Sequence, residues 1–213
     1  MKQSFPNFRV LTVLGAMAVV SVVSPVAKAD INIVQNGSFD LNSPAGGTAP
    51  VDWTLINAAS GSDFYVGAGA TYGALSAPNS ANFGATGSSD DTLEQTLVTT
   101  PGTTYVLSYE LAHNNTDNEN DFSAIWNGTT VTGSALVNAS VFPYTLYTFD
   151  VTATGTSTIL AFAGREVPAW YDLDDVSVTS TTTPEPGFML LLTAGLGGLY
   201  AFRRRRATPD QSK

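Results

Sequence analysis

The stretch Tyr105-Val106-Leu107-Ser108-Tyr109-Glu110-Leu111 decides the fold class, because large apolar side chains occupy every second position. Strand side chains point alternately to two faces, so this pattern predicts a strand with one buried face. The same alternation recurs over residues 147–153, and residues 158–163 and 176–178 predict two more strands. No window between them has the 3.6-residue period of a helix. The pattern therefore predicts an all-β domain.

Turn signals cut this region into short pieces. Pro101-Gly102 and Asn127-Gly128 are the clearest, since Pro fixes φ and Gly adopts positive φ freely. Many short strands with frequent turns are typical of a β-sandwich. We expect a single β-sandwich over residues 30–179, followed by a Thr- and Pro-rich linker over 180–186.

The N-terminus has the pattern of a secretory signal peptide. Lys2 and Arg9 make a basic start, residues 10–23 are uncharged and apolar, and Ala27-Lys28-Ala29 supplies the small residues that signal peptidase reads. We expect a signal-peptide helix over residues 1–29, with cleavage after Ala29. An uncleaved anchor is the alternative.

The C-terminus combines three elements in a fixed order. Pro184, Glu185 and Pro186 precede an uncharged apolar run over 187–202, which is followed by Arg203, Arg204, Arg205 and Arg206. As a helix this run spans about 24 Å, slightly short of the roughly 30 Å hydrocarbon core of a membrane, and the arginines can snorkel to make up the difference. The arginines favour the cytoplasmic side. A single transmembrane helix over 187–206, with a polar tail over 207–213, is the expectation, and a plain membrane anchor is its simplest interpretation.

The same tail closely resembles the PEP-CTERM sorting signal of Gram-negative bacteria. The resemblance covers residues 184–206 and rests on order, spacing and position. It implies recognition by an exosortase, removal of the tail and export to the surface or extracellular matrix. The protein would then be held in the inner membrane only as an intermediate, before the tail is removed.

The charge and the cysteine content exclude several kinds of partner and binding site. The whole chain carries a formal charge of −9, but residues 30–183 hold sixteen acidic side chains, Arg165 and no lysine. Such a domain lacks the cations that neutralise phosphates, so we expect no nucleic-acid partner. The chain has no cysteine, which excludes disulfides and thiolate sites, and its single histidine, His113, excludes multi-histidine metal sites.

A second resemblance covers most of residues 30–180. It rests on the opening Asn36-Gly37-Ser38-Phe39-Asp40, the strand entry at 101–105 and the closing stretch at 170–178, which reads WYDLDDVSV. These are similar to the galactose-binding-domain-like jelly roll of carbohydrate-binding modules. The resemblance implies a structural calcium between the first and last strands, with Asp40 and Asp174 at the matching positions. The family usually has Glu where this chain has Asp40.

The residues themselves give a modest case for that calcium site. Alternation places Asp172, Asp174 and Val176 on one face, and an Asp174 that points inward is costly unless it is paired or bound to a metal. A carboxylate that accepts backbone amides in a turn is the alternative. The acidic run at 114–121 lacks the Gly and terminal Glu of an EF-hand and is expected to be a solvated turn.

Two tryptophans are the candidates for sugar binding. Trp126 precedes the turn at Asn127, and Trp170 follows Pro168, so both are expected to be partly exposed. Aromatic rings stack on sugars, but in a sandwich they more often belong to the core.

We expect no catalytic residues and no cofactor apart from calcium. A secreted hydrolase would need a serine set around His113, or a carboxylate pair drawn from Glu94, Glu110, Glu119 and Asp121. The expected function is therefore that of an exported, non-catalytic surface or matrix protein associated with exopolysaccharide. A specific carbohydrate-binding module is the alternative, and signal peptidase and exosortase are the expected processing partners.

Overall fold

The computed structural model describes residues 30–41, 49–57, 61–69, 72–114 and 119–181, together with Gly195. The signal-peptide and sorting-helix predictions lie outside these residues, apart from Gly195. Within the described part of the chain, no helix is both long and apolar enough to cross a membrane. Residues Lys28–Pro184 form one compact unit, which contains every described strand.

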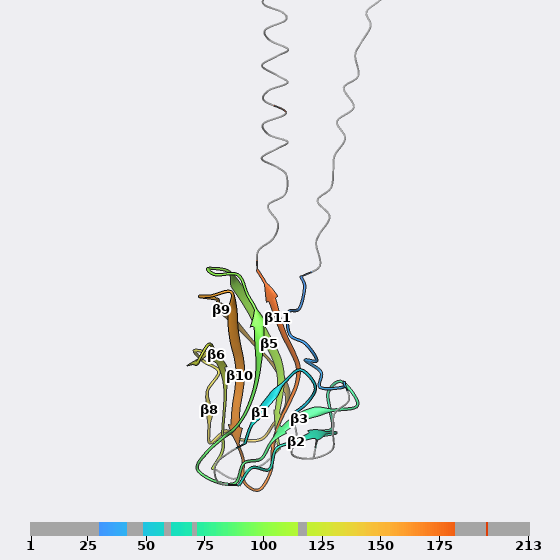
Figure 1. Ribbon diagram of the computed structural model, residues 1–213. Coiled ribbons are helices and arrows are strands. Elements are labelled where there is room, and N and C mark those ends of the chain that lie inside the picture. Colours follow the sequence, from blue (N-terminus) through green and yellow to red (C-terminus); the bar gives the residue numbers. More distant parts are fainter. Residues whose placement is uncertain are drawn as a thin grey trace, which may run out of the picture. The chain divides into compact units, whose positions relative to one another are not determined.

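The described chain is an all-β sandwich, as the sequence predicts (Figure 1). One antiparallel sheet has the order β1-β4-β10-β6-β7, with β8 also paired to β6, and we call it sheet A. The other, sheet B, has the order β2-β3-β11-β5-β9. The strands are β1 (Thr54–Ile56), β2 (Tyr65–Gly67), β3 (Ser80–Phe83), β4 (Asp91–Val98), β5 (Thr104–His113), β6 (Asp121–Trp126), β7 (Thr129–Thr130), β8 (Leu136–Val137), β9 (Phe142–Thr152), β10 (Ser157–Arg165) and β11 (Tyr171–Ser180).

The alternating stretches form long strands where the sequence predicts them. In β5, Leu107, Tyr109 and Leu111 are fully buried, while the side chains between them are partly exposed. The turn signals are also confirmed, because Gly102 has φ 77° and the pair Asn127-Gly128 has φ 50° and 79°. Those values lie in the left-handed region, which Gly and Asn tolerate best.

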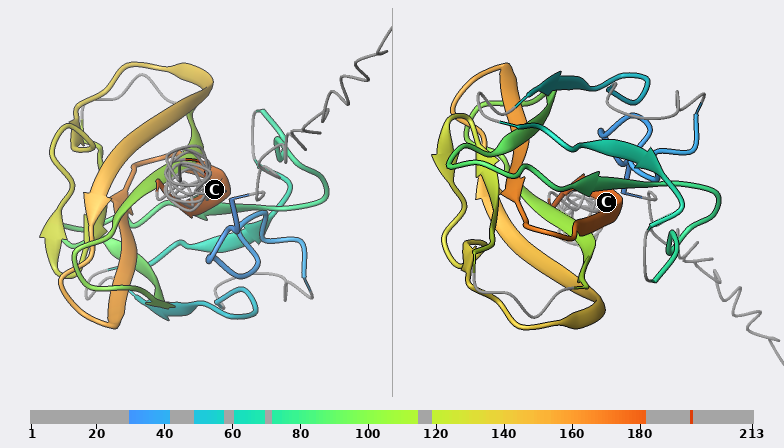
Figure 2. Two further views of the ribbon diagram at one scale, coloured as in Figure 1. Left: turned by 90° about the horizontal axis from the view of Figure 1, so that it is seen from above. Right: turned by 90° about the horizontal axis from the view of Figure 1, so that it is seen from below.

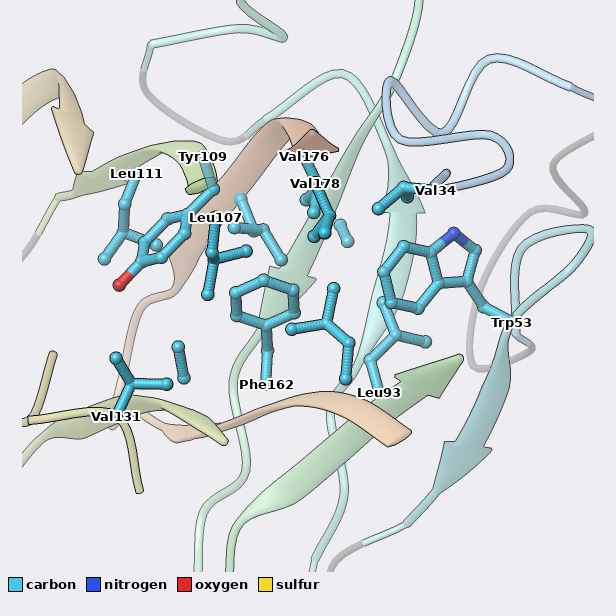
Figure 3. Packing of buried hydrophobic residues seen from close by; sticks show 14 of the residues in the cluster. Val34, Trp53, Leu93, Leu107, Tyr109, Leu111, Val131, Phe162, Val176 and Val178 are labelled. Carbon is cyan, nitrogen blue, oxygen red and sulfur yellow. The ribbon is translucent and has the colours of Figure 1, made fainter. Parts of the chain in front are cut away.

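The core fills the space between the two sheets, which face each other in the end-on views of Figure 2. Figure 3 shows Leu107 and Tyr109 of β5 lying opposite Phe162 of β10. The Phe162 ring contacts Tyr109 edge-on at a centroid distance of 5.1 Å and Trp53 at 6.3 Å. This aromatic packing replaces the disulfides that the chain cannot form.

Strand β11 lies in the middle of sheet B and has partners on both sides. It pairs with β5 along most of its length and with β3 over its first three residues. Beyond β3 the N-terminal segment takes over, because Ile33 N–H donates to Val178 O at 2.9 Å and Val176 N–H donates to Gly37 O at 2.9 Å. A Cβ on Gly37 would lie 2.1 Å from Val176 O, so only glycine allows this approach.

A β-bulge in β11 corrects one prediction. The register shifts between Asp174 and Ser177, and Asp175 has φ 48°. Asp172 and Asp174 share the outer face of sheet B, but the bulge turns Val176 into the core, where it is 2% exposed. The prediction that Val176 shares a face with Asp174 is therefore wrong, because strict alternation fails where an extra residue is inserted.

Candidate functional site

The last strand leads directly into the C-terminal tail. β11 ends at Ser180, one residue beyond the expected domain boundary. Thr181 still belongs to the sandwich, since its N–H and Oγ1 both donate to Thr104 O, at 3.1 and 3.0 Å. Residues Pro184, Glu185, Pro186 and the four arginines lie outside the described residues. The tail therefore starts at the end of the central strand of sheet B.

The two predicted calcium ligands contact the same loop, residues 72–79, but at different places. Asp174 is fully buried and accepts from Ser76 N–H at 2.9 Å, from Ser76 Oγ at 3.0 Å and from its neighbour Asp175 N–H at 2.8 Å. Asp40 accepts from Asn79 N–H at 3.0 Å. Burial raises the pKa of Asp174 to about 6, although the Ser76 and Asp175 donors act to lower it.

These donors decide how well the pair suits calcium. An N–H directed at a carboxylate oxygen occupies an approach that a cation would otherwise use, so Asp174 matches the hydrogen-bonded alternative. A hollow of about 520 Å³ is lined by Asp40 and Asp175, and Asp174 is not part of its lining. The described residues hold no group of three or more His, Cys, Asp or Glu that could bind a metal. Calcium at Asp40 and Asp174 stays a prediction.

The Ser76 hydroxyl lies between the carboxylates of Asp174 and Asp175. Ser76 Oγ lies 2.8 Å from Asp175 Oδ1 as well as 3.0 Å from Asp174 Oδ1. A hydroxyl has a single hydrogen, so Ser76 can donate to only one of the two carboxylates.

Asp172 differs sharply from Asp174, although both lie on the outer face of sheet B. Asp172 is fully buried, and neither of its carboxylate oxygens has a hydrogen-bond partner. Burial raises the pKa of Asp172 to about 7, and His113 on the neighbouring strand only partly opposes this. A buried carboxylate without a donor is the kind of group that marks a functional place in a fold.

Trp170 lies near Asp172 in sequence and is half-buried. Its ring Nε1–H donates to Asp63 O at 3.1 Å, and its ring lies nearly perpendicular to the Tyr65 ring at a centroid distance of 5.5 Å. Its backbone N–H donates to Asn114 Oδ1, while Asn114 Nδ2 is buried without a partner. The expected partial exposure of Trp170 is confirmed.

The expected exposure of Trp126 is wrong, because this residue is 8% exposed. Alternation along β6 directs Phe122, Ala124 and Trp126 inward, and Trp126 packs against Tyr105. Its Nε1–H donates to Thr152 O at 3.0 Å. A hollow of about 270 Å³ lies beside it, lined mainly by threonines, Phe149 and Asp150. Trp126 lines this hollow but is almost completely buried.

The residues of the hydrolase alternative do not form a described catalytic group. His113 is fully buried, with Nε2 at 2.6 Å from Glu166 Oε2 and Nδ1 at 3.2 Å from the backbone oxygen of Ser140. Glu94 lies on β4 of sheet A and Glu110 on β5 of sheet B. Asp121 instead accepts from Arg165 Nε at 2.6 Å, and Glu119 is exposed in the loop before β6.

The partner of His113 and the two unpartnered groups were not predicted from the sequence. Glu166 is fully buried in the segment after β10. The residues that flank it in the sequence do not distinguish it from a carboxylate on the surface. For Asp172 the sequence contains one indication of its position, because alternation places it on the same face of the strand as Asp174. Its lack of a donor depends on the loops above it, which sequence periodicity does not describe.

Comparisons with known proteins match both parts of the chain. A protein-family model described as the PEP-CTERM protein-sorting motif matches residues 182–206. Curated proteins give no sequence match. Among solved structures, the enzymatically active domain of tailspike protein 4 from bacteriophage CBA120 has a TM-score of 0.52 at 17% identity. The match covers 70% of this chain and only 21% of the tailspike chain.

Two carbohydrate-binding modules are also among the similar structures. The CBM22-1 xylan-binding domain of Paenibacillus barcinonensis Xyn10C has a TM-score of 0.47 at 17% identity, covering 74% of this chain and 99% of that one. A family 35 module from Clostridium thermocellum has a TM-score of 0.42 at 16% identity, covering 64% and 97%. The chain thus consists of a jelly-roll β-sandwich followed, at residues 182–206, by a PEP-CTERM protein-sorting motif, which indicates an exported, surface-directed protein processed by exosortase.

Proposed function

We propose that this chain is a non-catalytic protein of the cell surface or extracellular matrix that associates with exopolysaccharide. The observation that carries this proposal is the sorting motif at residues 182–206, which begins immediately after the sandwich ends at Thr181. Because the sorting signal directly follows the sandwich, the sandwich is the part of the chain that the signal delivers. The acidic, lysine-free domain supports the proposal, since a large negative charge keeps an exported protein soluble.

Delivery follows from the order of the segments. Signal peptidase removes residues 1–29 during export, and residues 187–206 then hold the chain in the inner membrane of a Gram-negative cell. Exosortase then removes the tail, which separates the sandwich from the apolar segment. The buried His113–Glu166 pair supports a non-catalytic role, because a general base must reach substrate.

The tail gives the decisive test. Replacing Arg203, Arg204, Arg205 and Arg206 together by alanine removes the orientation and recognition signal, so we expect released protein to fall at least about tenfold. Mass spectrometry of the wild-type released form should find no peptide from the arginine cluster. Asp210→Asn, in the polar tail beyond the motif, serves as the control and should be processed normally. A mature wild-type protein that stays in the membrane and still carries Arg203 to Arg206 would mean that the tail is an anchor.

Specific sugar binding is the second candidate function, and Trp170 is the residue that favours it. Its half-exposed ring lies beside Tyr65, and the buried Asn114 Nδ2 lacks a partner nearby. Rings of this kind stack on sugars while amides bind hydroxyl groups. The fold alone does not identify a ligand.

Trp170→Ala should weaken binding to the host exopolysaccharide at least about tenfold, because a stacking platform is a typical hot spot. Affinity electrophoresis in gels that contain the polysaccharide measures this. Trp126→Phe is the matched control, since Trp126 is buried in the core. Full retention of binding by a folded Trp170→Ala protein contradicts the platform.

A further inference from the structure

The two ends of the sandwich differ in charge. One of them, which we call the tail-side end, consists of the turns 99–103 and 153–156 and of the chain exit at Thr181 (Figure 1). The turn 127–128 lies close to it, because β6 ends beside the start of β10. These turns are built from threonine, glycine, proline, alanine and asparagine, and none of their residues is charged.

Charged side chains gather at the opposite end of the sandwich. The first residue of β4, Asp91, and the last residue of β10, Arg165, both lie there. The acidic residues at that end are Asp90, Asp91, Glu119 and Asp121. β4 runs between the two ends, because it starts at Asp91 and finishes at Val98, about 23 Å away. This distance exceeds twice the Debye length of about 8 Å at physiological salt, so these charges are screened from the tail-side end.

Large apolar side chains are exposed at the tail-side end. Val98 is 84% exposed and Ile31 is 65% exposed. Both line the same hollow of about 450 Å³, to which Ile33 also contributes and in which Asp52 is the one charged lining residue. The tail-side end thus combines exposed apolar groups with neutral, threonine-rich turns.

Two acidic residues come nearest to this end. Asp150 lies on β9, two residues before that strand finishes. Asp30 precedes the exposed Ile31, and cleavage after Ala29 makes it the first residue of the exported chain. The new α-ammonium group then offsets its carboxylate. The other acidic residues of the sandwich lie farther from the turns that form the tail-side end.

The sorting tail leaves from the tail-side end. Thr181 is held by hydrogen bonds to Thr104, and the uncharged apolar run begins at residue 187. The chain between them spans at most about 20 Å when fully extended. This step rests on the proposed function, in which residues 187–206 hold the chain in the inner membrane. The membrane surface then lies within reach of this end of the sandwich.

We propose that the tail-side end is a docking surface for the phospholipid headgroups of the inner membrane, and that it is occupied while the tail is attached. Anionic headgroups repel carboxylates that lie within a Debye length, and this end carries few of them. Threonine hydroxyls are donors for phosphate oxygens, and Val98 and Ile31 suit the boundary between headgroups and acyl chains. Removal of the tail ends the contact, because two apolar side chains are too few to hold a protein on a membrane.

Site-specific fluorescence tests the docking surface, since the chain has no cysteine and accepts one label at a time. Residues 30–213 are reconstituted in vesicles of phosphatidylethanolamine and phosphatidylglycerol that contain a nitroxide headgroup lipid. With the fluorophore on Val98→Cys, we expect quenching at least about threefold stronger than on Ser88→Cys, because strand geometry separates the two positions by roughly 20 Å or more. Both positions are exposed, so neither label disturbs the core.

An added charge gives the second measurement. Thr154→Asp places a carboxylate in the exposed turn 153–156. It should shift the ratio of docked to undocked protein about fivefold toward the undocked form, which is the effect of one elementary charge near an anionic membrane. Ser88→Asp adds the same charge at the opposite end and should leave quenching at position 98 unchanged.

Flotation of the vesicles separates this inference from the proposed function. If the chain does not float with the vesicles, residues 187–206 do not hold it in a membrane, and both fail. If it floats but the labels at 98 and 88 are quenched equally, only the docking surface is overturned. Disulfide-linked dimers of Val98→Cys would show that a second copy covers this end instead. Equal losses for Thr154→Asp and Ser88→Asp would mean that total charge governs the contact.

Discussion

Replacing Glu166 by alanine is expected to lower the free energy of unfolding by about 3–5 kcal/mol. Glu166 and His113 are both fully buried, and Glu166 Oε2 lies 2.6 Å from His113 Nε2. The other ring nitrogen faces the Ser140 carbonyl, which is an acceptor. Both ring nitrogens therefore face oxygen atoms inside the core. Removing Glu166 leaves a buried imidazole nitrogen without its partner.

Chemical denaturation of residues Lys28–Pro184 measures this loss. The control is Asp121→Ala, which breaks an Arg165 contact of the same 2.6 Å length between partly exposed side chains. Exposed pairs contribute roughly 0–1 kcal/mol, so this change should be much milder. A double-mutant cycle with His113→Ala isolates the coupling. Equal losses for the two variants would show that burial of the His113–Glu166 pair carries no special weight.

Replacing Phe162 by alanine should cost about 3–5 kcal/mol, which makes it the second of the two large effects. Phe162 lies on β10 and is fully buried, and its ring meets Trp53, Tyr109 and Phe122 at centroid distances of 5.1–6.3 Å. These neighbours come from both layers of the sandwich, so they cannot all close on the space that the ring leaves.

Val98→Ala provides the comparison, because Val98 is 84% exposed at the end of β4. Surface changes of this kind stay within about 0.5 kcal/mol. Urea denaturation of both variants gives the difference. A Phe162→Ala loss close to that of Val98→Ala would mean that the core repacks around the missing ring.

The sequence predicts the fold well wherever alternation is unbroken. Leu107, Tyr109 and Leu111 are buried as expected, and the turns at Gly102 and Gly128 adopt the positive φ that their residues favour. Alternation fails at Val176, because the β-bulge inserts an extra residue into the strand and the side-chain pattern of the sequence does not reveal where that happens.

Site residues were harder to predict than strands. Trp170 is partly exposed because it precedes β11. Trp126 continues the inward face of β6, and the turn that follows it led to the wrong expectation. Glu166 and Asp172 owe their character to chain segments that are remote in sequence. Tertiary packing decides whether a buried carboxylate pairs with a histidine, accepts hydrogen bonds or has no hydrogen-bond partner. The local sequence pattern does not contain that information.

The attachment of the tail to β11 has a mechanical consequence. Any pull on the C-terminus, whether from a membrane or from a surface layer, acts along the strand that lies between β3, the N-terminal segment and β5. The load then shears many hydrogen bonds at once, whereas a peripheral strand such as β9 could peel away one pair at a time. Resistance to force is set by the rate of unfolding. A load applied to the C-terminal end of β11 is therefore shared by more hydrogen bonds than a load applied to an edge strand.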